Sequence, residues 1–402
     1  MNILKKTYCR IYQQIFRLIL PLMPYRQPEI LNSMNEIPQA IKNNNCQKCL
    51  IVTGATSVKL KLTDSLEKIL DNANISYELF SETVPNPTSD SVEKAKNIYL
   101  QNNCDSIIGL GGGSAMDCAK AIGAVIVRPN KSISQLKGLL KIHKKLPLLI
   151  AIPTTAGTGS ETTVASVIVD SNTRQKYAIS DFCLIPDYAV LDEKLTLTLP
   201  AQLTATTGID ALTHAIEAYI GQSTTKETRN FSENAVKLIF ENLPIAYTAG
   251  SNIQARKNML IASYQAGCAF TRSYVGYVHA IAHSLGGKYN IGHGLANAVI
   301  LPYMLKAYGS SIYKQLAHLA IYCEMCSKDT PTEQAANIFL DNLNKLNKQL
   351  NIPNKIKELK KEDIPLLAIQ ADKEANPLYP VPVLMNNKEL ETIYKKLLIS
   401  IN

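Results

Sequence analysis

The residues with the clearest chemical potential are histidines that gather in the second half of the chain. The sequence contains 6 histidines, and His279, His283 and His293 all lie in the stretch GYVHAIAHSLGGKYNIGHG. Upstream, Asp210 and His214 stand four positions apart in GIDALTHAIEAY. One carboxylate and several imidazoles form a ligand set that holds catalytic divalent metal ions. These two segments therefore predict a metal site.

Helical spacing would bring these side chains together. Positions i and i+4 share one face of a helix, so Asp210 would project beside His214, and His279 beside His283. The glycines around His293 let the chain fold back on itself. A single buried histidine is usually a hydrogen-bonded core residue, whereas so many metal-capable side chains in two compact segments favour a site.

Two loops in the first half of the chain could bind a phosphate-bearing cofactor. The first, SIIGLGGGSAMDCAK, begins at Ser106 and has the pattern of a strand, a glycine turn and a helix start. Its glycines let the backbone approach a ligand, and Ser114 would cap a helix whose free N–H groups favour a phosphate. The pattern differs from the GxGxxG dinucleotide fingerprint, so a simple strand–helix turn is the alternative.

The second loop, IPTTAGTGSETT, begins at Ile152 and also follows an apolar run. Its threonines and serine supply hydroxyls that suit phosphate or ribose, and its glycines supply flexibility. Taken alone, such a segment is usually only a loop. Two such loops at the ends of parallel strands, however, predict a dinucleotide-binding crevice.

Short apolar runs alternate with helical patterns in the first half of the chain and thereby predict the elements that carry these loops. The runs are CLIVTG, SYELF, SIIGL, PLLIAIP, ASVIVD and YAVLD. Their alternation predicts a largely parallel sheet with helices on both faces, and helical patterns dominate after Pro200. We expect an N-terminal extension with an amphipathic helix over residues 1–30, a dinucleotide-binding α/β domain over 31–199 and an all-helical metal-binding domain over 200–402.

The charge and the N-terminus narrow the class of protein. The net charge is +9, but aromatic residues do not interleave with the basic runs, which argues against nucleic-acid binding.

The apolar run IFRLILPLM near the N-terminus contains Arg17 and Pro21, and it is too short to span a bilayer. It resembles a signal peptide only superficially, and weak contact with a membrane surface stays open.

The 9 cysteines are an odd number, which fits reduced thiols in the cytoplasm. Two CxxC pairs, Cys46–Cys49 and Cys323–Cys326, raise the alternative of a structural zinc site. Neither pair is flanked by glycine-rich knuckle sequence, so small core residues are the favoured interpretation.

Four motifs stand in one order along the chain: GGGSAMDCAK, PTTAGTGSE, GIDALTHAIEAY and HAIAHSLGGKYNIGHGLANA. The order and spacing of these motifs resemble those of the iron-containing (group III) alcohol dehydrogenase family, which has a dehydroquinate synthase-like fold. The resemblance covers nearly the whole chain. It implies a Rossmann-like, dinucleotide-binding α/β domain followed by an all-α metal-binding domain.

The resemblance also assigns roles to residues. It makes Asp210, His214, His279 and His293 the metal ligands. It places His283 near the nicotinamide and the substrate, where the imidazole would relay a proton. Its cofactor-contacting positions are Asn86, Gly112, Gly113, Ser114, Thr154, Thr155, Thr158, Thr163, Val167 and Lys176.

Gly54 is an informative departure from the family pattern. NAD-preferring relatives carry an aspartate there, which would bind the ribose 2′-hydroxyl and repel a 2′-phosphate. Its absence, with Thr56, Ser57 and Lys59 nearby, predicts that NADP is accepted. The ligand set suits Fe²⁺ and Zn²⁺ alike, and the resemblance favours Fe²⁺.

The implied reaction is reversible hydride transfer between a primary alcohol or aldehyde and NAD(P). We expect a cytoplasmic homodimer or larger homo-oligomer that acts on a small molecule, without a transmembrane segment or a nucleic-acid partner. The alternatives are a glycerol dehydrogenase-like or dehydroquinate synthase-like enzyme on the same fold, and a non-catalytic scaffold. Arg272 and Lys288 are the only basic candidates near the site for the phosphorylated acid that a dehydroquinate synthase needs.

Overall fold

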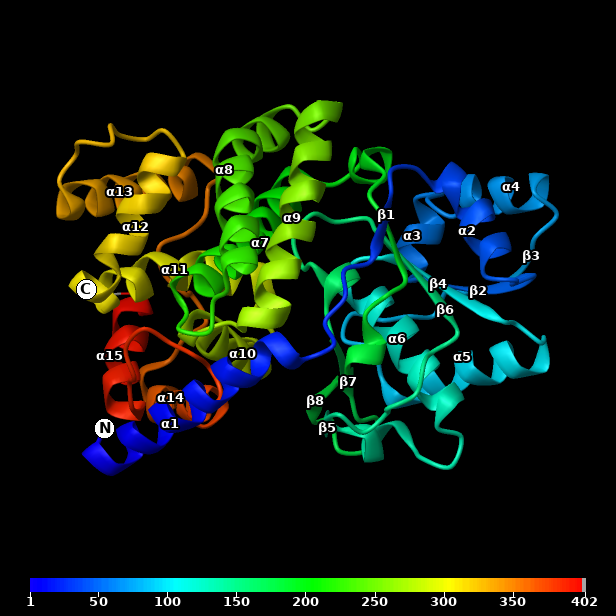
Figure 1. Ribbon diagram of the computed structural model, residues 1–402, viewed down its shortest axis with the longest axis horizontal. Helices are drawn as coiled ribbons and strands as arrows, with labels where there is room; N and C mark the ends of the chain where they lie inside the picture. Colours follow the sequence, from blue (N-terminus) through cyan, green and yellow to red (C-terminus); the bar gives the residue numbers. More distant parts are fainter. Residues whose placement is uncertain (400–402) are drawn as a thin grey trace. The chain divides into compact units, whose positions relative to one another are not determined.

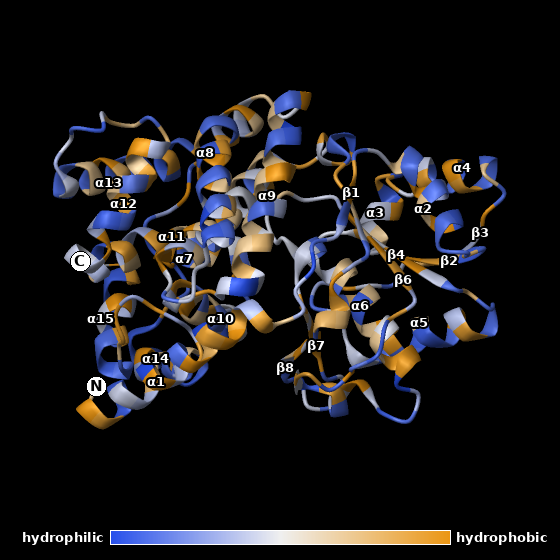
Figure 2. Ribbon diagram, in the orientation of Figure 1, coloured by the Kyte–Doolittle hydropathy of each residue, from blue (hydrophilic) through white to orange (hydrophobic). Residues whose placement is uncertain are grey.

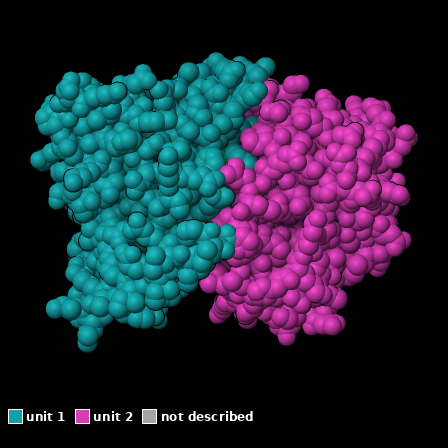
Figure 3. Space-filling view, viewed as in Figure 1, with its two compact units in different colours: residues 1–23, 199–402 teal, residues 24–198 magenta. Residues whose placement is uncertain are grey.

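The computed structural model describes residues 1–399, and the chain divides into two compact units. One unit comprises residues 24–198, and the other combines residues 1–23 with residues 199–402, as the colours of Figure 3 mark. The N-terminal helix thus groups with the second half of the chain. Each unit has its own architecture, and each carries a different part of the chemistry predicted above.

A parallel sheet of six strands forms the centre of the unit 24–198 (Figure 1). In spatial order the strands are β1 (Glu29–Leu31), β9 (Tyr188–Val190), β6 (Leu148–Pro153), β4 (Ser106–Gly111), β2 (Lys48–Val52) and β3 (Ser76–Phe80). The helices of this unit are α2 (Ile37–Asn43), α3 (Ala55–Lys59), α4 (Asp64–Asn72), α5 (Ser89–Gln101) and α6 (Gly113–Val127). The predicted parallel α/β fold is confirmed.

Successive residues of the central strands enter two different hydrophobic clusters. In β2, Leu50 and Val52 pack with residues of α5 and α6, whereas Cys49 and Ile51 pack with residues of α2 and α4. Because side chains alternate across a sheet, a strand that is covered on both faces must be apolar throughout. The central strands are accordingly hydrophobic in Figure 2, which is why CLIVTG and PLLIAIP are recognisable in the sequence.

The run ASVIVD forms a strand outside the main sheet. It is β7 (Ala165–Val169), which pairs in antiparallel fashion with β8 (Lys176–Ser180) in a separate sheet that also contains β5 (Gly138–Leu139). In β7 only every second residue is buried, so one face of this small sheet is covered less than the faces of the main one.

Helices make up the regular structure of the other unit, in which α1 (Ile3–Ile19) precedes the long series after residue 200. That series is α7 (Ala201–Ile220), α8 (Lys226–Thr248), α9 (Ile253–Ser273), α10 (Tyr277–Tyr289), α11 (His293–Tyr308), α12 (Tyr313–Tyr322), α13 (Thr332–Gln349), α14 (Ile364–Ala375) and α15 (Asn387–Leu397). None of the helices in the described part of the chain has the length and apolarity needed to cross a membrane.

Candidate metal centre and cofactor loops

Helix α7 supplies the first two candidate ligands from the interior of the helical unit. From Gly208 to Ile220 every residue of this helix is buried, and Asp210 and His214 lie one turn apart. A helix that is apolar nearly all round must lie in the core. The two polar side chains are therefore held in a dry environment.

A short turn brings the other two candidate ligands near them. Helix α10 carries His279 and ends at Tyr289, and α11 begins at His293. Asn290 adopts a left-handed conformation, with a φ of 56°, and thereby ends α10. A Cβ atom on Gly294 would overlap the backbone carbonyl of Thr206 in α7. Glycine at this position therefore lets the start of α11 lie directly against α7 and brings His293 to Asp210.

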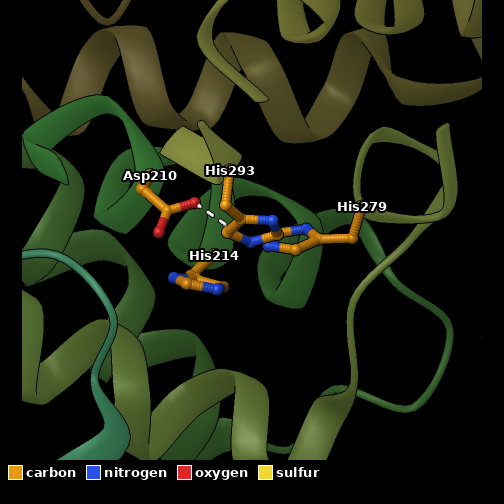
Figure 4. A group of neighbouring side chains, drawn as sticks. All are labelled: Asp210, His214, His279 and His293. Carbon is orange, nitrogen blue, oxygen red and sulfur yellow. Dashed lines mark ion pairs between the residues drawn. The ribbon is translucent and has the colours of Figure 1, made fainter. Parts of the chain in front are cut away.

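The four predicted ligands converge on one point (Figure 4). One ligand atom from each of Asp210, His214, His279 and His293 lies within 4.8 Å of the other three. His293 Nε2 stands 3.5 Å from Asp210 Oδ1, and the ring of His214 stacks on that of His279 with centroids 4.6 Å apart. Helices far apart in the sequence thus present an Asp/His₃ set to a common centre.

A carboxylate behind the centre orients His279. Glu217 Oε2 accepts hydrogen bonds from His279 Nδ1 at 2.6 Å and from the backbone N–H of Gly276 at 2.8 Å. Its Oε1 accepts a third from the N–H of Val278 at 2.8 Å. Because Nδ1 carries the proton in this bond, the lone pair of Nε2 is directed at the centre. Such carboxylate–histidine pairs fix the tautomer of metal-binding imidazoles.

The donor chemistry of the centre fits a divalent cation. Asn297 Nδ2 lies 2.6 Å from Asp210 Oδ1, 3.2 Å from His279 Nε2 and 3.1 Å from His293 Nε2. One amide group has only two hydrogens to offer these three atoms. Burial raises the pKa of Asp210 to about 7 and that of Glu217 to about 7, and hydrogen bonds and the charge of His283 offset this only in part. A cation at the centre would further favour the ionised form of Asp210.

His279 is held neutral by its surroundings. Burial and, second, the charge of His283 lower the pKa of His279 well below its usual value. A neutral imidazole is the form that coordinates a metal ion. The environment thus favours the ligand form of this residue.

His283 lies beside the centre on the accessible side. The exposed fraction of its side chain is 42%, and its ring stacks on that of His293 with centroids 5.1 Å apart. Its Nδ1 makes a 2.6 Å hydrogen bond with Glu374 Oε1, which also accepts from the hydroxyl of Tyr379 at 2.8 Å. Burial by itself would raise the pKa of Glu374. The charge of His283 and these hydrogen bonds outweigh burial, so the pKa of Glu374 lies below its usual value.

In the other unit, the two predicted cofactor loops lie side by side. The N–H of Thr154 donates to the carbonyl of Gly111 at 2.9 Å, and a Cβ on Gly113 would stand 3.2 Å from Thr158. Gly111 has a φ of 151°, and a Cβ there would stand 2.7 Å from the Cβ of Ala115. Glycine is therefore required for α6 to start immediately after β4.

Other predicted cofactor positions gather at the start of α6. The N–H of Asn86 donates to Ser114 Oγ at 3.2 Å, and Lys176 Nζ donates to Asn86 Oδ1 at 2.7 Å. Gly112 precedes the helix, and a Cβ on it would stand 3.6 Å from Thr155 Oγ1. Three chain segments thus meet where the N-terminus of α6 offers free N–H groups.

Gly54 lies at the end of β2 and caps α3. A Cβ on it would stand 2.9 Å from the backbone oxygen of Thr83. An acidic side chain could occupy this position only if the backbone moved.

Asp117 and Lys120, both on α6, fix the second loop through hydrogen bonds. Lys120 is fully buried, and its Nζ donates to the backbone oxygens of Ser160 and Thr163 at 2.6 and 3.0 Å and to Thr163 Oγ1 at 2.7 Å. Asp117 accepts from Ser160 Oγ at 2.9 Å and from the N–H of Val167 at 3.1 Å. The hydroxyl of Thr163 and the N–H of Val167 therefore bond within the protein.

Several supporting residues were not among the predicted ones. Glu217 lies seven positions after Asp210, and Asn297 four after His293, so helical spacing could have revealed both. Glu374 lies on α14, far from the histidines in sequence, and no local pattern marks it.

A parallel sheet with glycine and hydroxyl loops after its strands, together with an Asp/His₃ centre on helices, defines a metal-dependent oxidoreductase. Residues 31–193 match the family model "Iron-containing alcohol dehydrogenase", and residues 204–398 match the model of the C-terminal domain of Fe-containing alcohol dehydrogenases. The chain belongs to the iron-containing alcohol dehydrogenase family, as its motifs predicted.

Individual relatives agree with this assignment. The NAD-dependent methanol dehydrogenase of Bacillus methanolicus is 37% identical over 341 residues, which cover 84% of this chain and 89% of that protein. The NADPH-dependent butanol dehydrogenase of Clostridium saccharobutylicum is 34% identical over 323 residues, 80% of this chain and 82% of that protein. The crystal structure of a 1,3-propanediol oxidoreductase matches with a TM-score of 0.89 and 32% identity, covering 93% and 99% of the two chains. The protein is a metal-dependent alcohol dehydrogenase.

Proposed function

We propose that this protein transfers a hydride reversibly between a small primary alcohol, or the corresponding aldehyde, and a nicotinamide cofactor. The observation that carries the proposal is the convergence of Asp210, His214, His279 and His293 within 4.8 Å. We assign these four residues as ligands of one divalent ion. The family favours Fe²⁺, and the chemistry of the ligands also suits Zn²⁺. Relatives named for methanol, butanol and 1,3-propanediol support a small primary alcohol.

A bound metal ion would supply Lewis acidity toward the substrate oxygen, and a bound nicotinamide would supply or accept the hydride. The side chains of the protein set the charge of the site and the orientation of the ligands. Asp210 offsets the positive charge of the ion, and Glu217 keeps the lone pair of His279 Nε2 directed at it. Asn297 donates to Asp210 and holds that carboxylate in place.

His283 is the proposed proton carrier between the substrate and solvent. Glu374 binds its Nδ1, so that Nε2 is the nitrogen left to accept and release the proton. Its partial exposure and its place beside His293 support this role. A His283→Ala enzyme should lose about a hundredfold in kcat and change its pH profile. An unchanged kcat and pH profile would rule the role out.

The unit 24–198 is the proposed cofactor-binding domain, and the helices after residue 199 are the proposed metal-binding domain. The proposed cofactor contacts are Gly54, Asn86, Gly112, Gly113, Ser114, Thr154, Thr155, Thr158, Thr163, Val167 and Lys176. The hydrogen bonds that join Asn86 to Ser114 and Lys176 support a shared binding surface. Lys120 and Asp117 are positioning residues that hold the second loop.

NADP is accepted as a cofactor in this proposal. The absence of an acidic group at Gly54 supports it, because no carboxylate there would repel a 2′-phosphate. The relative named NADPH-dependent butanol dehydrogenase supports such use. Steady-state kinetics test the point: a much higher kcat/KM for NADH than for NADPH would contradict it.

The protein is further proposed to act as a homo-oligomer in the cytoplasm. The described cysteines are all free thiols, which supports a reducing compartment. The edge strands β1 and β3 each leave one side of the sheet open to pairing. Sedimentation equilibrium and cell fractionation test these two statements.

A panel of alcohols and aldehydes with both cofactors, on protein whose metal content is measured, tests the proposed function. We expect metal-dependent oxidation of NADH or NADPH in the presence of small aldehydes. Metal-loaded protein that turns over none of them with either cofactor would contradict the proposal.

A further inference from the structure

Helix α1 binds to the helical unit through an unusual face. Its buried residues are Cys9 and Gln13, and Gln13 Nε2 donates to the backbone oxygen of Tyr379 at 2.7 Å. Arg10 donates to the backbone oxygens of Val381 and Pro382 at 2.8 and 2.7 Å. These polar bonds hold the helix against the loop after α14, beside which it lies in Figure 1, and Phe16 packs edge-on against Tyr274 with ring centroids 5.0 Å apart. A surface helix normally turns its apolar face inward instead.

The apolar face of α1 points away from the protein. We call it the α1 stripe, and it consists of Leu4, Tyr8, Ile11, Ile15 and Leu18. These residues recur at alternating intervals of four and three, which places them on one side of a helix. Their exposed fractions range from 53% to 82%. A helix with one exposed apolar face has the amphipathic form of helices that bind at an interface.

The charges beside the α1 stripe are all positive. Residues 3–19 read ILKKTYCRIYQQIFRLI, with four basic residues and no acidic one. Lys5 pairs with Asp372 at 2.9 Å, whereas Lys6 and Arg17 are exposed on the flank between the bound face and the stripe. Apolar residues flanked by lysine and arginine are typical of helices that lie in the interface of an anionic membrane.

We propose that α1 attaches this enzyme to the surface of an anionic lipid membrane. The helix would lie in the plane of the membrane, with the α1 stripe among the lipid headgroups and acyl chains. Lys6 and Arg17 would contact lipid phosphates at its side. Residues 1–30 precede the match to the family model, which starts at residue 31.

A second copy of the chain fits the α1 stripe less well. The 17 residues of α1 extend about 25 Å, and a helix is about 10 Å wide. One face therefore offers roughly 250 Å², against the roughly 800 Å² per partner of a stable interface. Two α1 helices face to face would also bring basic residues together without an acidic partner in either helix. A lipid surface requires neither a large complementary area nor a fixed partner geometry.

Vesicle flotation with the full-length protein tests the proposal. We expect binding to vesicles of phosphatidylcholine with phosphatidylglycerol, and little binding to phosphatidylcholine alone. The Lys6→Gln and Arg17→Gln exchanges should each weaken binding to anionic vesicles about fivefold. Added salt should weaken it further because surface charges are screened. A wild-type protein that floats with neither type of vesicle would overturn the proposal.

A double variant separates the α1 stripe from other exposed apolar residues. Ile11→Asp with Ile15→Asp should abolish flotation and leave alcohol dehydrogenase activity unchanged, which shows that the protein is folded. The matched control, Ile245→Asp with Ile253→Asp, changes exposed isoleucines of α8 and α9 and should still float. Equal flotation of the stripe variant and the wild type would refute the membrane role.

Sedimentation equilibrium without lipid tests whether a second copy of the chain covers the α1 stripe. The stripe variant should form the same assembly as the wild type. A smaller assembly in the stripe variant would mean that another copy of the chain covers the stripe, and the membrane proposal would then be wrong.

Discussion

Exchange of Glu217 for glutamine is the most incisive perturbation of the metal centre. The carboxylate accepts three hydrogen bonds, from His279 Nδ1 and from the N–H groups of Gly276 and Val278. Glutamine has nearly the same shape but only one accepting oxygen. At least one buried N–H group must then face the amide nitrogen, which costs about 1–3 kcal/mol of folding free energy.

The metal affinity should fall because His279 loses its fixed orientation and part of its basicity. Loss of such a supporting partner weakens metal binding about 10- to 100-fold, which corresponds to about 1.4–2.7 kcal/mol. Competition between the metal-free protein and a chelator of known affinity measures this change, with Co²⁺ or Zn²⁺ as the titrated ion.

Glu161→Gln provides the matched control for this experiment. Glu161 is fully buried in the other unit, and burial raises its pKa to about 7, as it does for Glu217. It has no hydrogen bond to a proposed ligand, so its exchange should leave metal affinity unchanged. A Glu217→Gln protein that binds metal within about twofold of the wild type would refute the orienting role.

Three further variants, two of them with a matched control, test how the chain positions the metal site and the cofactor site. Gly294→Ala should displace the start of α11 from Thr206 and weaken metal binding about tenfold or more, whereas Gly292→Ala, whose Cβ would meet nothing within 4 Å, should not. Lys120→Met should leave the buried carbonyl of Thr163 without a donor and remove the shortest hydrogen bond of the Ser160 carbonyl, lowering the free energy of unfolding in urea by about 2 kcal/mol and raising KM for the cofactor; an unchanged KM would contradict the anchoring role. Gly54→Asp should reduce kcat/KM for NADPH about tenfold relative to Gly54→Ala, which meets the same backbone oxygen without adding a charge. Equal loss in both Gly54 variants would show that only space matters at this position.

Much of the α/β fold could be predicted from the sequence because its strands are buried on both faces. Runs such as CLIVTG and PLLIAIP are apolar throughout and therefore conspicuous. Strand β1 contains only three residues, Glu29–Leu31, and is too short to produce a pattern. The separate sheet of β7 was not predicted, because strand pairing is a tertiary property that the run ASVIVD does not encode locally.

The metal centre was accessible from sequence because helical spacing links its ligands in pairs. Asp210 and His214 share a face of α7, and the short turn before His293 is marked by glycines. The approach of α7 to α11 depends on the contact of Gly294 with Thr206, which no local pattern reveals. The family resemblance supplied that long-range information.

The roles of buried polar groups were the least predictable feature. Lys120 lies in a recognisable motif, yet its full burial against the second loop follows only from the fold. Helix α1 illustrates the same limit. Its amphipathic pattern predicts a helix, but the polar bonds of Arg10 and Gln13 decide that the apolar face remains exposed.

The number of metal ions bound per chain, in the wild type and in single-ligand variants, tests the central claim most directly. Mass spectrometry of the metal content should find about one divalent ion per wild-type chain. The His279→Ala and His293→Ala proteins should bind almost none, whereas His318→Ala, which changes a histidine outside the cluster, should bind as much as the wild type. Full metal occupancy in both ligand variants would contradict the assignment of this centre.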